Sequence, residues 1–417
     1  QDHQISLNGI YTNEFTIPTI PKIFLYNMNA LFNKLPYLCL LFACCFGAFL
    51  FHATDKPLKY AILFSSMIAF CATFSRKDSF ILLKEYLRYI SPWLPWFFGI
   101  FTLTLIHSGK HIYLDSFLLL SLPFLALYKT DIKRHWVLYV IAFSCLSLSL
   151  AIILEVYTNG LSRDIFNINK NILLPSIALL MSVCLATLIF NCKNYPFTLI
   201  ALLVLSILTT LVAIVFTEVR TALLALVGQI PLVIFAQKKH RIKTLVIVLS
   251  MFFAMLIVFF QTGRLQQGYS DLIQYQAGNP DSSWGIRLEL WKLSFDAFLS
   301  KPFLGWGEMP FQEILNSGFS FPVPTFVIGH AHSDFFNMLV CLGLLGVSSW
   351  LITIVFVIRS SLGDPLRLSI IFACLMMGLT ERLWFENRAC LYMMSTVWVL
   401  LYLSDPSTKN SQLNKKI

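Results

Sequence analysis

One histidine stands where a long polar stretch of the sequence meets an apolar run. Ser333 follows His332 directly, and Gly343 and Gly346 come 11 and 14 positions after the histidine. A neutral imidazole can remove a proton from a hydroxyl group near neutral pH. In a regular helix Gly343 would share a face with His332, and Gly346 would lie about 40° away. The spacing indicates either a general base at the end of a membrane helix, with Ser333 or Asp334 as its cap, or an interfacial histidine with two helix-packing glycines.

Arginines in separate connections could bind an anion near this histidine. Arg220 lies in a short link between two apolar runs, where Glu218 is its simplest ion-pair partner. Arg287 lies in the first turn of an expected helix, where the helix dipole disfavours a cation. A bound anion would relieve that conflict, and so would a salt bridge with Glu289 or Asp281. Guanidinium groups suit the recognition of phosphate or pyrophosphate.

Further ionisable residues are supporting candidates. Glu381, Arg382 and Arg388 precede the last apolar run, where ion pairing among themselves and with Glu386 is the simpler interpretation. Arg163 is a weaker candidate of the same kind. The chain has no Asp-x-Asp motif and no Cys/His ligand spacing, so we expect no metal site. The set suits a transfer in which a diphosphate leaves and arginines neutralise its charge in place of a metal ion.

The composition predicts an all-α polytopic membrane protein. Of 417 residues, 57% are hydrophobic and 12% are charged, whereas soluble domains carry about 25% charged residues. The net charge of +10 is concentrated in short loops between apolar runs, which is a topology signal, so we predict no nucleic-acid partner. The ten cysteines lie mostly inside apolar runs and indicate no disulfide framework.

Apolar runs of about the length that crosses a bilayer recur along the chain. We predict about twelve transmembrane helices, at residues 36–53, 58–74, 91–107, 114–128, 136–157, 172–191, 197–216, 221–237, 244–260, 334–358, 366–380 and 389–403.

The Lys and Arg residues of alternate loops fix the expected orientation, because basic loops stay in the cytoplasm. Residues 1–35 and 404–417 are then cytoplasmic, residues 36–260 hold the first nine helices, and residues 333–403 hold the last three. Residues 261–332 form one large periplasmic loop. The protein is therefore expected to be an inner membrane protein, with most of its unusual polar residues on the outer face.

The large loop is expected to be partly helical and to cover a cavity. Apolar residues recur in it at intervals of three and four, as on one face of an amphipathic helix: Leu288, Trp291, Phe295 and Phe298. The segment 281–283 offers N-caps, and Lys301-Pro302 should end the helix.

The residues described above resemble the O-antigen ligase family. His332-Ser333, nine residues, Gly343, two residues and Gly346 match its histidine motif at the end of the large periplasmic loop. The segments 220–224 and 285–291 resemble its two arginine segments, and the segment 381–388 resembles the residues before its last span more loosely. The motifs cover about residues 220–346, and the twelve spans agree with the family's architecture.

This resemblance implies transfer of a polysaccharide from undecaprenyl diphosphate to a sugar hydroxyl of lipid A–core, without metal or another cofactor. His332 would be the general base on the acceptor hydroxyl, and Arg220 and Arg287 would bind the donor diphosphate. The partners implied are the lipid-linked O-antigen donor, the lipid A–core acceptor and membrane lipids.

Other functions stay open. O-antigen polymerases and bacterial protein O-oligosaccharyltransferases are similar in fold to the ligases. The protein-modifying relatives usually carry an extra region after the histidine span, whereas only 14 residues follow the last span predicted here. A transporter of lipid-linked sugars should place ionisable residues near the bilayer midplane. The spans here are largely free of charge, which favours chemistry at the membrane surface.

Overall fold

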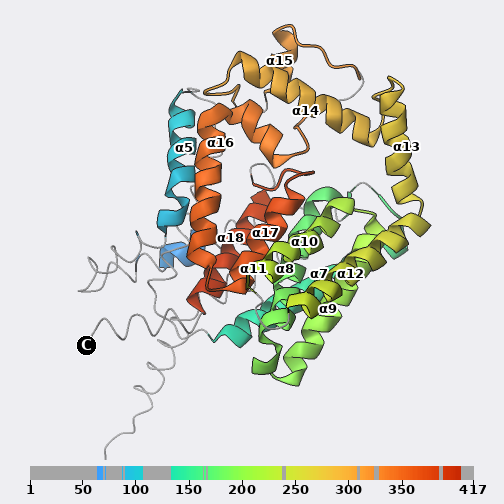
Figure 1. Ribbon diagram of the computed structural model, residues 1–417. Helices are drawn as coiled ribbons and strands as arrows, with labels where there is room; N and C mark the ends of the chain where they lie inside the picture. Colours follow the sequence, from blue (N-terminus) through green and yellow to red (C-terminus); the bar gives the residue numbers. More distant parts are fainter. Residues whose placement is uncertain are drawn as a thin grey trace, which may run out of the picture.

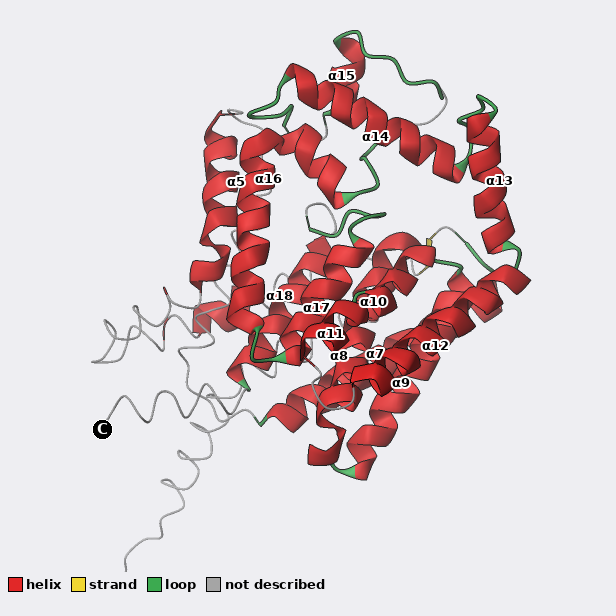
Figure 2. Ribbon diagram, in the orientation of Figure 1, coloured by secondary structure: helices red, strands yellow, loops and turns green. Residues whose placement is uncertain are grey.

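A computed structural model describes residues 63–68, 71, 87, 90–106, 133–162, 164–165, 168–236, 241–307, 310–323, 328–384 and 388–404. Within this part the regular elements are helices, apart from one short hairpin in which β1 (Asp164–Ile165) pairs antiparallel with β2 (Ile168–Asn169). The predicted all-α class is therefore confirmed for the described residues (Figures 1 and 2).

Nine of the twelve predicted runs coincide with described helices. In chain order these elements are η1 (Ser91–Trp93), α5 (Leu94–Ile106), α7 (Arg134–Asn159), α8 (Lys170–Asn191), η3 (Cys192–Asn194), α9 (Phe197–Thr217), η4 (Arg220–Leu223), α10 (Leu224–Val227), α11 (Gln229–Ala236), α12 (Arg241–Gln261), α16 (Asp334–Ser361), α17 (Pro365–Met377) and α18 (Arg388–Leu403). The predicted runs 36–53 and 114–128, and most of 58–74, lie outside the described residues.

By length and composition, five described helices can cross a membrane: Arg134–Asn159, Leu173–Asn194, Phe197–Thr217, Arg241–Gln261 and Asp334–Ser361. Three further apolar helical segments are shorter: Arg220–Phe235, Pro365–Met377 and Met393–Leu403. The chain is thus a multi-pass membrane protein, while the count of twelve spans and their orientation stay predictions.

The helix α8 lies at the centre of the bundle. It contacts α7, α9, α17 and α18. In its most apolar stretch 83% of the residues are buried, against 22% in the corresponding stretch of α12. A helix that is apolar all round is stable only when protein or lipid covers every face. The difference in burial places α8 in the protein core and leaves α12 on the outside of the bundle.

An ion cluster fixes one end of this bundle. Asp364, which caps α17, accepts from the Leu366 N–H at 3.1 Å. The same carboxylate pairs with Arg134 of α7 at 2.5 Å and with Arg367 at 3.0 Å. Because a buried carboxylate is stable only when paired and hydrogen-bonded, the cluster ties the start of α7 to the link between α16 and α17.

The predicted loop contains α13 (Arg264–Gln276), α14 (Ser283–Ser300) and α15 (Phe311–Asn316). Figure 1 shows α14 crossing the end of α16, with α13 connecting it to α12. The predicted α14 is confirmed, since Ser282 caps it through a 3.1 Å bond from the Gly285 N–H and it ends before Lys301-Pro302.

The buried side of α14 differs from the predicted one. Leu290, Leu293 and Ala297 are buried together with Phe298, whereas Phe295 is 47% exposed. The three- and four-residue spacing identified the helix correctly. It did not identify the buried side, because most residues of this helix are partly covered and several faces carry apolar side chains.

The helix α16 is kinked at Gly343, whose φ and ψ are 61° and −160°. The segment after α14 supplies backbone hydrogen bonds at this kink. The bonds run from Trp306 N–H to Val340 O at 2.9 Å, from Gly307 N–H to Cys341 O at 2.9 Å, from Leu344 N–H to Pro302 O at 2.8 Å and from Leu345 N–H to Phe303 O at 3.2 Å. The large loop is thereby joined to the middle of a membrane helix by main-chain atoms.

The kink corrects the predicted packing of the two glycines. A regular helix would have set Gly343 on the face of His332 and against a neighbouring helix. Instead, a Cβ atom on Gly343 would lie 2.7 Å from the backbone of Phe303 and Gly305, in the loop. A Cβ atom on Gly346 would meet the side chain of Leu342 in the same helix. Both glycines make room for the kink, and the close approach is to the loop.

Replacing Gly343 with alanine should destabilise the protein. The positive φ and the contact with the loop backbone together cost about 2–5 kcal/mol in the free energy of unfolding. Thermal unfolding of the protein in detergent measures the loss. Gly363→Ala is the matched control, since no atom lies within 4 Å of the added Cβ. Equal melting temperatures for the two variants would show that the kink is not under this constraint.

Candidate functional site

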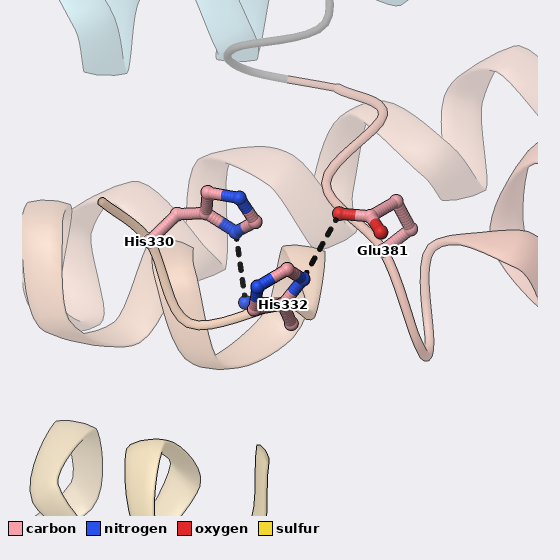
Figure 3. Close-up of side chains that lie close together, drawn as sticks. All are labelled: His330, His332 and Glu381. Atoms are coloured by element: carbon pink, nitrogen blue, oxygen red, sulfur yellow. Dashed lines mark hydrogen bonds and ion pairs between the residues drawn. The ribbon is translucent and has the colours of Figure 1, made fainter. Parts of the chain in front are cut away.

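Four segments distant in sequence meet at one end of α16. They are the loop before α16, the loop after α17, η4 and the first turn of α14. Figure 3 shows the centre of the site, where His330 and His332 from the first loop face Glu381 from the second.

His332 and Glu381 form a half-buried pair. Nδ1 of His332 lies 3.4 Å from Oε1 of Glu381, and the two side chains are 21% and 5% exposed. The φ of His332 is +49°, a left-handed conformation that few side chains other than those of Asn, Asp and His adopt. His332 therefore occupies a left-handed backbone turn, and its imidazole lies against the Glu381 carboxylate.

Neighbouring side chains hold that turn in place. Trp291 of α14 donates its indole N–H to the Ala331 carbonyl at 2.9 Å, and its ring stacks on Phe336 of α16 at 5.2 Å. The Ala331 N–H donates to Asn337 at 3.4 Å. Because α14 and α16 both hold Ala331, the residue between the two histidines, they also fix the position of His332.

His330 lies directly against His332. Its Nδ1 accepts the backbone N–H of His332 at 3.1 Å, and the two ring centroids are 3.9 Å apart. Burial, and then the charges of His332, Arg382 and Arg287, lower the pKa of His330 to about 2. His330 is therefore neutral near pH 7, as a ring that accepts a hydrogen bond at Nδ1 must be.

Asp334 connects the two loops. Its Oδ1 accepts the N–H groups of Leu383 at 2.8 Å and Trp384 at 3.0 Å. Its own N–H donates to the Gly378 carbonyl at 2.8 Å. These bonds hold the segment that carries Glu381. Ser333 occupies the N-cap position of α16, yet its side chain forms no capping bond, and Asp334 binds the neighbouring loop.

Both predicted arginines lie near Trp284. The guanidinium of Arg287 lies 5.8 Å from the Trp284 ring centroid. Gly268 of α13 faces Arg220 and Trp284 together, because a Cβ atom added there would lie 3.0 Å from Nη1 of Arg220 and 3.5 Å from the indole nitrogen. Burial lowers the pKa of Arg287, Glu381 opposes that effect and Arg220 adds to it. Arg287 is therefore close to both the carboxylate and the second arginine.

Two of the expected ion-pair partners, Glu218 and Glu289, are engaged elsewhere. Glu218 pairs with Arg264, while Arg220 donates only a long 3.4 Å bond to the Arg264 carbonyl. Glu289 accepts from the Tyr275 hydroxyl at 2.9 Å. Within the part of the chain that the structure describes, Arg287 forms no ion pair or hydrogen bond. Two guanidinium groups therefore remain for an anion.

The segments of Arg220 and Glu381 also touch directly, since the Thr380 hydroxyl bonds that of Thr221 at 3.3 Å. The structure thus brings together Arg220, Arg287, His332 and Glu381, and Arg382 is near enough to act on His330. Arg163 and the side chain of Arg388 lie outside the described residues.

Several residues of the site were not predicted as such. They are His330, Trp284, Trp291 and Asn337. The position of His330 two residues before His332 was a usable signal. The others are ordinary aromatic and polar residues whose roles depend on which loops meet.

The comparison with known families bears on these same residues. Residues 202–351 match the family described as O-antigen ligase. The matched range includes Arg220, Arg287, His332 and both glycines, so the predicted resemblance to O-antigen ligases is confirmed there. Glu381 lies beyond it. A comparison with curated proteins gives no match.

Asp334→Ala should loosen the loop that carries Glu381. The substitution leaves the N–H groups of Leu383 and Trp384 without an acceptor. Each buried N–H group without an acceptor lowers the free energy of unfolding by about 1–3 kcal/mol. Asp334→Asn keeps an acceptor oxygen and should lose much less. Melting temperatures in detergent test this order, with Asp296→Ala, an exposed residue of α14, as the control. A larger loss for the asparagine variant than for the alanine variant would contradict the proposed anchoring.

Proposed function

We propose that this protein is an O-antigen ligase, which moves O-antigen polysaccharide from undecaprenyl diphosphate to a sugar hydroxyl of lipid A–core. The observation that carries the proposal is one site that joins a histidine–carboxylate pair to two arginines that form no ion pair among the described residues. The match to O-antigen ligases over the same residues supports it.

The histidine–carboxylate pair supplies the base. Glu381 lies 3.4 Å from Nδ1 of His332, and its charge favours the tautomer that is protonated at Nδ1 and leaves Nε2 free. Nε2 removes the proton of the acceptor hydroxyl as the oxygen bonds to the anomeric carbon of the donor. The bond from that carbon to the diphosphate oxygen breaks at the same time. The proton stays on His332, where Glu381 stabilises the imidazolium.

The two arginines receive the charge that this step releases. The departing undecaprenyl diphosphate gains a negative charge, and Arg220 and Arg287 stabilise it without moving. Donors that are fixed before the reaction stabilise developing charge most effectively. Their shared neighbourhood around Trp284 suits two adjacent phosphate groups, so the proposed transfer requires no metal ion.

The rest of the assignment follows from the orientation of the helices. With the basic loops in the cytoplasm, the site faces the periplasm at the surface of the inner membrane. The apolar helices would then hold the donor's polyprenyl chain and the acceptor's acyl chains. An O-antigen polymerase would differ in its acceptor, a second lipid-linked sugar chain.

Variants in a ligase-deficient bacterial cell test the function. The wild-type chain should restore a lipopolysaccharide ladder, whereas His332→Ala, Arg220→Ala and Arg287→Ala should each reduce it by about 10²-fold or more. Arg359→Ala, an exposed arginine in the last turn of α16, is the control and should leave the ladder intact.

The result can contradict the proposal in two ways. A full ladder from a well-expressed His332→Ala protein would show that His332 is not the base. If the wild-type chain lengthens lipid-linked chains and never caps lipid A–core, the protein is a polymerase.

Gly268→Val should weaken donor binding specifically. The added methyl groups displace the Arg220 guanidinium, so we expect the KM for the lipid-linked donor to rise about tenfold, or ~1.4 kcal/mol, with little change for the acceptor. Gln274→Val places the same side chain at an exposed position of α13 and controls for helix propensity. Equal effects on donor and acceptor would argue against a diphosphate site at Arg220.

A further inference from the structure

We infer that His330, His332 and Glu381 form a site for a divalent transition-metal ion of the zinc class, and that an ion bound there blocks the base. The binding half of this inference is independent of the proposed function. The blocking half rests on it.

The positions of the donor atoms carry the inference. One ligand atom from each of the three residues lies within 4.8 Å of the others. Nδ1 of His332 and Oε1 of Glu381 are 3.4 Å apart, which is long for a hydrogen bond. It matches the separation of about 3.4 Å between two ligands at the corners of a tetrahedral zinc site with bonds of about 2.1 Å.

Unpartnered atoms at the same place are a second observation. Nδ1 of His332 and Oε2 of Glu381 are buried and accept or donate no hydrogen bond among the described residues. The Glu381 side chain is only 5% exposed. A carboxylate oxygen buried this deeply normally has a partner, and a cation between Glu381 and the imidazoles would supply one.

The donor set decides the class of ion. Two imidazoles and one carboxylate suit zinc and its neighbours among the first-row transition metals, with a fourth position open to water. Magnesium prefers six oxygen ligands at near-octahedral positions, which this group does not provide. Nδ1 of His330 now accepts the His332 N–H, so an ion that takes this lone pair must displace one short-range hydrogen bond.

The surrounding charges indicate weak, reversible binding. Arg287 and Arg382 are close enough to lower the pKa of His330, and they repel a dication as well. The ion should therefore exchange with solution and act as an inhibitor. An ion on Nδ1 of His332 leaves the imidazole proton on Nε2, and Nε2 then cannot accept the proton of the acceptor hydroxyl.

Calorimetric titration of the purified full chain in detergent with zinc chloride tests the binding. We expect one site whose affinity falls at least tenfold in His330→Gln, in His332→Gln and in Glu381→Gln, each checked for a monodisperse elution profile. His135→Gln is the matched control, since His135 lies beside the Arg134–Asp364 pair at the opposite end of α16. Equal zinc affinity in all three variants and the wild type, or no zinc binding at all, would overturn the inference.

A transfer assay separates the two halves. Zinc should inhibit donor-to-acceptor transfer by the wild type, EDTA should reverse the inhibition, and magnesium should have no effect. Transfer that zinc leaves unchanged while the calorimetric site fills would overturn the blocking half. Loss of transfer on adding EDTA alone would show that the ion serves the reaction, and would overturn it also. A wild type that binds zinc at this site but transfers nothing contradicts the proposed function and leaves the site standing.

Discussion

The carboxylate of Asp334 is the constraint on which the site depends. It stands at the start of α16 and accepts two N–H groups from the loop after α17, so it joins segments that are about 50 residues apart. The loop that it holds carries Glu381, and the turn before it carries His332. The bond between Thr380 and Thr221 and the packing of Trp384 against Trp93 and Trp350 support the same segment.

The kink at Gly343 serves the same site from the other side. In a continuous helix the backbone N–H and C=O groups bond within the helix. At the kink in α16 some of these groups bond instead to the segment after α14. This fixes the C-terminal end of α14, and Trp291 fixes its middle against the turn of His332. Arg287 lies one turn earlier on the same rigid helix. The position of Arg287 relative to His332 is therefore set by the main-chain bonds at the kink and by the Trp291 indole.

The sequence pointed to His332, Arg220 and Arg287 individually, but it did not pair His332 with Glu381. His332 and Arg220 could be identified because a titratable or cationic residue at the edge of an apolar run is unusual. Arg287 could be identified because a cation near the start of a helix opposes the helix dipole. Glu381 was only a supporting candidate, since it lies 49 positions after His332 in another loop. The patterns used to look for metal ligands could not detect that pairing. Likewise, the period of α14 identified a helix, but only tertiary contacts determine which side is buried.

The distribution of acidic partners explains how one small site can serve an anionic donor. Glu218, the nearest acid in sequence to Arg220, pairs with Arg264, and Glu289 bonds Tyr275. Glu381 lies beside His332, and its charge also opposes the effect of burial on Arg287. Among the described residues neither Arg220 nor Arg287 forms an ion pair. Both are partly buried, where electrostatic interactions are stronger than in water. The same excess of positive charge that would hold a diphosphate limits how tightly any cation can bind beside it.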